Sequence, residues 1–68
     1  MDYEQKLELA KFKCKIDKMV ATRLITKTEK LEKEFFELRD QRDISKAKTL
    51  IPYLEMVTNV LRNRMLLN

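Results

Sequence analysis

The side chains that could do chemistry in this 68-residue chain are few. It contains no histidine and no glycine, and Cys14 is its only cysteine. Histidine is the most common general acid or base at neutral pH, and glycine-rich loops cradle phosphate, so two frequent kinds of active site cannot be built in their usual form. An internal disulfide and a Cys/His zinc site are excluded for the same reason.

The remaining candidates are Cys14, carboxylates, lysines and tyrosines, and their spacing favours a structural role. Cys14 shares a helical strip with Ala10 and Ala21, so we interpret it as a packed small residue and not as a nucleophile. Acidic residues recur three or four positions from lysines and arginines, as salt-bridged pairs do on a solvated helix face. We therefore predict no catalytic residue, no metal site and no cofactor.

Size and composition point to a helical protein that associates. The chain is 44% hydrophobic and 38% charged, and a chain of this length buries only about 60% of the surface that it exposes when unfolded. Small domains without disulfides or metals are commonly stabilised by oligomerisation. The acidic N-terminus and the lack of a long uncharged run predict a cytoplasmic protein without a membrane span.

Residues 49–67 form the most apolar stretch of the chain. Projected on a helix, their apolar side chains cover an arc of about 220°, whereas an ordinary surface helix needs a stripe only somewhat wider than 100°. This helix should therefore be covered from two sides, and a second copy of the chain or a partner protein is the most economical cover. We predict a homo-oligomer, with a dimer favoured.

Residues 2–23 form a helix with two apolar strips. The bulky strip (Leu9, Phe12, Ile16, Met19 and Val20) is assigned to the core, and the strip with small residues to a second contact, because small side chains let another helix approach closely. The reverse assignment also fits the pattern. The predicted oligomer interface combines the small strip with the last helix: Leu7, Ala10, Cys14, Tyr53, Met56, Val57, Val60 and Leu67.

The boundaries of the later helices depend on capping residues. Thr26 followed by Glu29 forms a capping box, which predicts a second helix over residues 27–41; the alternative is one unbroken helix from residue 2 to 41. Asp43, Ser45 and Thr49 can each cap the last helix. Thr49 would place Pro52 in the first turn, whereas a start near Asp43 would place it inside the helix.

The predicted fold class is all-α: one domain of three helices, the first two an antiparallel hairpin and the third packed across them. Phe36 does not fit the stripe of Leu31, Phe35 and Leu38, because it projects about 100° away from it. Exposed beside Arg39 and Glu32, it would form a protein-binding site, since aromatic and arginine residues are enriched at binding hot spots. The alternative is that a neighbouring segment buries it.

Nucleic-acid binding is the alternative function. The formal net charge is +4 and the isoelectric point is 9.4, and the basic candidates are Lys46, Lys48, Arg62 and Arg64, with Lys11, Lys15 and Lys18 as a further basic face. The second helix, however, is rich in glutamate, which phosphate repels. We expect a non-enzymatic protein that self-associates and binds another protein as an adaptor or inhibitor; the alternative is a small dimeric basic nucleic-acid-binding regulator.

Overall fold

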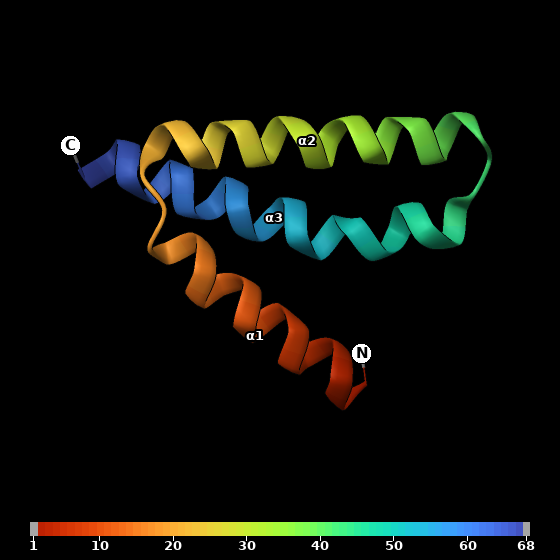
Figure 1. Ribbon diagram of the computed structural model, residues 1–68, viewed down its shortest axis with the longest axis horizontal. Helices are drawn as coiled ribbons and strands as arrows, with labels where there is room; N and C mark the ends of the chain where they lie inside the picture. Colours follow the sequence, from red (N-terminus) through yellow and green to blue (C-terminus); the bar gives the residue numbers. More distant parts are fainter. Residues whose placement is uncertain (1, 68) are drawn as a thin grey trace.

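The computed structural model describes residues 2–67, with the side chain of Leu67 outside the description. It contains helices α1 (Tyr3–Asp17), α2 (Ala21–Asp40) and α3 (Ile44–Leu67), and no strand within residues 2–67 (Figure 1). The all-α, three-helix prediction is confirmed. Asp2 begins α1, because its carboxylate accepts a 2.8 Å hydrogen bond from the Gln5 amide.

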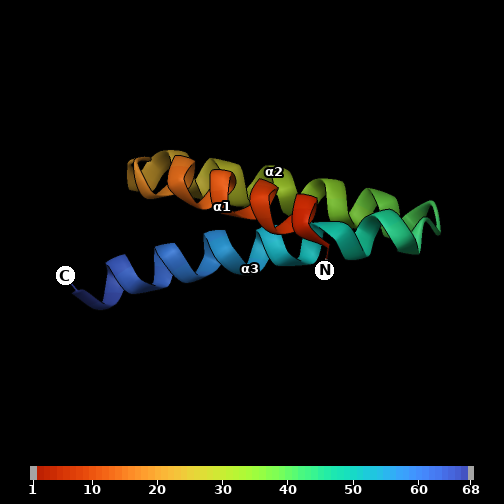
Figure 2. The same cartoon turned by 90° about the horizontal axis from the view of Figure 1, so that it is seen from below.

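Helix α3 contacts both of the other helices. Figure 1 shows α1 and α2 running in roughly opposite directions, as a hairpin would, but splaying apart, and α3 makes more contacts with α2 than with α1. Seen from below in Figure 2, α1 and α2 share one layer and α3 forms the other. The side of α3 that faces this layer is therefore covered within the chain, and its coverage does not require a second copy.

Each helix contributes one fully buried side chain to the core. These are Ile16 of α1, Leu24 of α2 and Val57 of α3. Partly buried hydrophobic residues surround them: Phe12, Met19, Leu31, Met56, Val60 and Leu61. Ile16 and Leu24 flank the α1–α2 turn, so the core is centred near that end of α2.

The break between α1 and α2 exists, but its predicted position was wrong. Helix α1 ends at Asp17 rather than at residue 23, and α2 begins at Ala21 rather than at residue 27. Thr26 does not cap a helix, because its hydroxyl donates to the Thr22 carbonyl at 3.1 Å inside α2. Threonine is accommodated in a helix interior by this kind of bond. Val20, which was assigned to the core strip, therefore lies in the turn and is 62% exposed.

The start of α3 was also misplaced, since it begins at Ile44 and not at residue 49. Asp43 is the cap, and its carboxylate accepts from the Lys46 amide at 3.3 Å. The Thr49 hydroxyl instead donates to the Lys46 carbonyl at 2.6 Å. Pro52 consequently lies inside α3, where it has no amide hydrogen to donate to the Lys48 carbonyl one turn earlier.

Candidate functional site

Phe36 is exposed and is held by its neighbours on α2. The residue is 46% exposed, and the guanidinium carbon of Arg39 lies 4.9 Å from the centroid of its ring. The Phe35 ring packs edge-on against it, with the two centroids 5.8 Å apart. Arg39 also pairs with the Asp40 carboxylate at 3.6 Å. The attraction between a cation and the face of an exposed aromatic ring stabilises this arrangement by about 0.5–1 kcal/mol. Phe36 is therefore an exposed aromatic side chain with a restricted orientation.

A groove of about 530 Å³ runs beside Phe36 between α2 and α3. Glu32 and Phe36 both line it, while Arg39 stacks on the ring, so the three residues predicted to bind a protein lie together. We call Glu32, Phe36 and Arg39 the Phe36 face. Arg62, predicted as a nucleic-acid contact, lines the same groove together with Glu32 and Glu55, so the lining carries both signs of charge. Mixed charge suits a protein surface better than it suits a phosphate backbone.

The α3 residues of the predicted oligomer interface belong mostly to the chain's own fold. Val57 is 0% exposed, so the prediction that it lies in an interface was wrong. Tyr53 is half-buried against the Phe12 ring, with the centroids 4.9 Å apart at 77°, and Met56 and Val60 pack on the core. The physical reason is that α1 crosses the part of the apolar arc that α2 leaves open. The side chain of Leu67, also predicted for the interface, is outside the part of the chain that the structure describes.

The α1 residues of the predicted interface are all open to solvent. Leu7 is 44% exposed, and Ala10 and Cys14 are exposed on the same side of α1. Tyr3 extends this strip and is 79% exposed. We call Tyr3, Leu7, Ala10 and Cys14 the α1 strip. The bulky side chains Phe12 and Ile16 point to the core instead, so the assignment of the two strips was right for these residues.

The four predicted nucleic-acid contacts do not form one patch. Lys46 and Lys48 are exposed near the start of α3, and Arg62 follows Lys48 by about 21 Å of helix. Arg64 is occupied: its guanidinium donates to the Met19 carbonyl and, at 2.9 Å, to the Asp17 carbonyl. It thus satisfies carbonyls at the C-terminal end of α1, where positive charge is stabilising.

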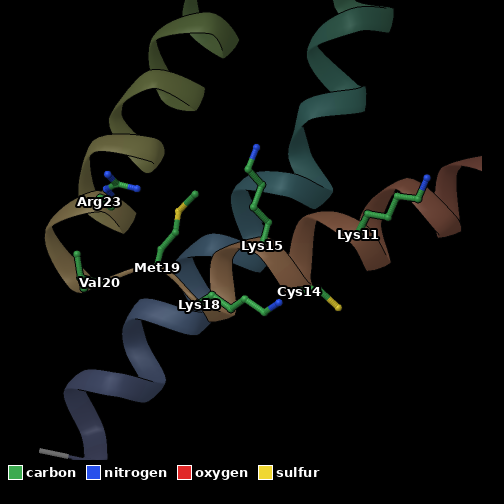
Figure 3. Close-up of a pocket in the computed structure, with 7 residues that line it drawn as sticks. All are labelled: Lys11, Cys14, Lys15, Lys18, Met19, Val20 and Arg23. Carbon is green, nitrogen blue, oxygen red and sulfur yellow. The ribbon is translucent and has the colours of Figure 1, made fainter.

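The structure assembles a basic groove that sequence reasoning did not find as a unit. It has a volume of about 780 Å³ at the α1–α2 turn, and its lining contains no acidic residue. We call it the basic groove, and Figure 3 shows the side chains that line it: Lys11, Cys14, Lys15, Lys18, Met19, Val20 and Arg23. The spacing of the three lysines was visible in the sequence, but Arg23 joins them only because the chain turns at residues 18–20.

Other kinds of site find no support in the part of the chain that is described. Over residues 2–67, no three histidine, cysteine, aspartate or glutamate side chains are grouped so that they could hold a metal ion. None of the three helices, within that range, combines the length and apolar character needed to cross a membrane. Comparisons with protein-family models, curated proteins and solved structures find no match for this chain.

Proposed function

We propose that this protein is a small non-enzymatic adaptor or inhibitor of the cytoplasm that self-associates and binds another protein through the Phe36 face. The observation that carries the proposal is the exposed Phe36 ring, stacked against Arg39 on a regular helix. Such a ring offers a large apolar area, and little conformational freedom is left to lose on binding. Aromatic and arginine side chains dominate the binding energy of many protein interfaces.

Self-association is supported by the α1 strip, since the α3 residues of the predicted interface with described side chains are buried or half-buried within the chain. Leu7, Ala10 and Cys14 are spaced by three and four residues, which is the spacing of a coiled-coil seam. Ala10 and Cys14 are small, so a second helix can approach α1 closely there. Tyr3 and Leu7 provide the apolar area that such a contact would bury.

The Phe36 face is tested by using the chain as bait in a nuclease-treated cell extract. We expect Phe36→Ala to lower the amount of retained protein at least about tenfold, since hot-spot side chains contribute 2 kcal/mol or more. Lys33→Ala is the matched control, because Lys33 is exposed on the same helix and outside the groove. Equal retention by wild type and Phe36→Ala, with the fold intact by circular dichroism, would show that Phe36 is not the binding residue.

Self-association is tested by light scattering, where a dimer weighs twice the 8.2 kDa of one chain. We expect Leu7→Glu to convert the dimer to the monomer, because it would place charge in the seam. Ile51→Glu is the control, since Ile51 is an equally exposed apolar residue on α3 and should leave the dimer intact. A wild-type chain that weighs 8.2 kDa at all concentrations contradicts this part of the proposal.

A further inference from the structure

The basic groove places four cationic side chains around one hollow. Lys11 and Lys15 lie about one turn apart on α1, and Lys18 is the C-cap that follows the last residue of that helix. Arg23 comes from the first turn of α2. In the view of Figure 3, Met19 rises between Lys15 and Arg23. The groove is thus a row of positive charges beside an apolar side chain.

No acidic residue is among those that line the groove with these charges. All four side chains are exposed, and the ion pair found within residues 2–67 is that of Arg39 with Asp40. Lysines four residues apart on a helix repel each other, which costs a few tenths of a kcal/mol per pair. A ligand with negative charges at the same spacing would remove this repulsion and add attraction.

The lining of the groove also includes apolar residues, and one of them, Val20, is an unfavourable residue at its backbone position. Val20 occupies the N-cap of α2, makes no side-chain capping bond there and is 62% exposed. Serine, threonine, aspartate and asparagine are strongly preferred at this position. A residue that breaks a local folding rule marks a candidate functional position. Here the exposed valine, with Met19 beside it, provides an apolar contact surface.

We propose that the basic groove binds an acidic amphipathic helix of a partner protein. Carboxylates spaced by three and four residues along that helix would pair with Lys11, Lys15 and Lys18, and its apolar residues would cover Met19 and Val20. This arrangement has the apolar centre and charged rim of a protein interface. The inference rests on the proposal that the chain binds proteins, but it concerns a different surface from the Phe36 face.

The lining of the groove favours a protein over a nucleic acid. No aromatic residue lines it, so bases have nothing to stack on. It also lacks asparagine, glutamine, serine and threonine, which commonly contact phosphates and sugars together with the basic residues. A hydrated phosphate strand would neutralise the lysines but leave Val20 and Met19 uncovered.

The test uses a fluorescent synthetic peptide of about 18 residues, long enough for several helical turns, with glutamates spaced by three and four residues beside leucines. The matched probe has glutamine at each glutamate, and single-stranded and duplex oligonucleotides serve as the phosphate probes. Binding is followed by fluorescence anisotropy at low salt. We expect the glutamate peptide to bind at least about tenfold more tightly than the glutamine peptide, which cannot form the charge pairs. It should also bind at least about tenfold more tightly than either oligonucleotide, which cannot make the apolar contact.

Lys15→Glu tests the groove directly, because it places a negative charge in the middle of the lysine row. We expect about tenfold weaker binding of the glutamate peptide, through lost attraction and added repulsion. Lys33→Glu makes the same change of charge at an exposed position of α2 outside the groove, and it should change the affinity by less than about twofold.

Val20→Ser separates binding from folding. Serine is a better N-cap than valine, so the melting temperature should rise. The peptide affinity should nevertheless fall severalfold, because the exposed apolar contact is removed. A variant that is more stable yet binds less tightly cannot have lost binding through unfolding.

Several results would overturn the proposal. These are equal binding of the glutamate and glutamine peptides, unchanged affinity in Lys15→Glu, tighter binding of an oligonucleotide than of the peptide, and no binding of any probe. A dimer that dissociates on Lys15→Glu would assign the groove to a second copy instead. Phe36→Ala should leave peptide binding unchanged, so the groove and the Phe36 face can fail independently.

Discussion

The two turns that flank α2 are closed in different ways. At the α2–α3 turn, the bonds join close neighbours: the Asp43 amide donates to the Leu38 carbonyl at 2.9 Å, and the Arg42 amide donates to the Arg39 carbonyl at 3.0 Å. This is the double hydrogen bond of a Schellman motif. At the α1–α2 turn, the carbonyls of Asp17 and Met19 are satisfied by Arg64, which lies 47 and 45 residues away.

This difference separates a turn that is specified locally from one that depends on tertiary structure. Asp43 is the last residue of the Schellman motif and also caps α3. Most of the hydrogen bonds that close the α2–α3 turn therefore lie within residues 38–46. The α1–α2 turn needs the last turns of α3 to be docked. Its own N-cap residue, Val20, contributes no side-chain capping bond. The attachment of α1 therefore depends on α3 more than the attachment of α3 depends on α1.

The largest effect is expected from core truncation beside the α1–α2 turn. Leu24→Ala removes a fully buried side chain and should lower the free energy of unfolding by about 3 kcal/mol. Ile44→Ala, beside the α2–α3 turn, removes a side chain that is half exposed and should cost less than about 1 kcal/mol. Urea unfolding followed by circular dichroism measures both values. Similar losses at the two positions would contradict a core centred near the α1–α2 turn.

An intermediate effect is expected from removing the long-range cap. Arg64→Ala deletes two hydrogen bonds from a half-buried guanidinium and should cost about 2 kcal/mol. Arg62→Ala is the matched control, because Arg62 is exposed and should change stability by less than about 0.5 kcal/mol. If the two variants melt at the same temperature, Arg64 does not hold the end of α1.

The smallest effect is a gain at the locally closed turn. Arg42 adopts a left-handed backbone conformation with φ of 61°, which is unfavourable for a residue with a Cβ atom. Arg42→Gly should therefore raise the free energy of unfolding by about 0.5 kcal/mol, the relief of strain being partly offset by the greater freedom of glycine in the unfolded chain. Arg42→Ala keeps the Cβ atom and serves as the control in the same thermal melts.

The contrast between the turns also explains what could be predicted of the fold. Helical periodicity and the absence of glycine indicated three helices, and Asp43 was one of the recognised caps for the last of them. The position of the α1–α2 turn was not predicted, because residues 18–20 include no glycine, proline or side-chain cap. Thr26 and Glu29 offered a better local signal, but burying Leu24 against Ile16 and Val57 keeps that segment helical.

The candidate sites also differ in whether one helix or the packing of two helices determines them. The position of Phe36 outside the apolar stripe follows from the projection of α2 alone, whereas its exposure depends on whether a neighbouring segment covers it. The burial of Val57 could not be anticipated, because it depends on the direction of α1 relative to α2 and α3. The approach of Arg23 to the α1 lysines likewise requires the position of the turn. Properties of one helix were predictable, and those created by two helices were not.

The reach of Arg64 across most of the chain bears on the order in which the structure forms. Closing a loop of 45 residues is entropically more demanding than joining α2 to α3 across three residues. We therefore expect the antiparallel α2–α3 pair to assemble first and α1 to dock last. Opening would follow the reverse path, so the amide hydrogens of α1 would exchange with solvent before those of α2.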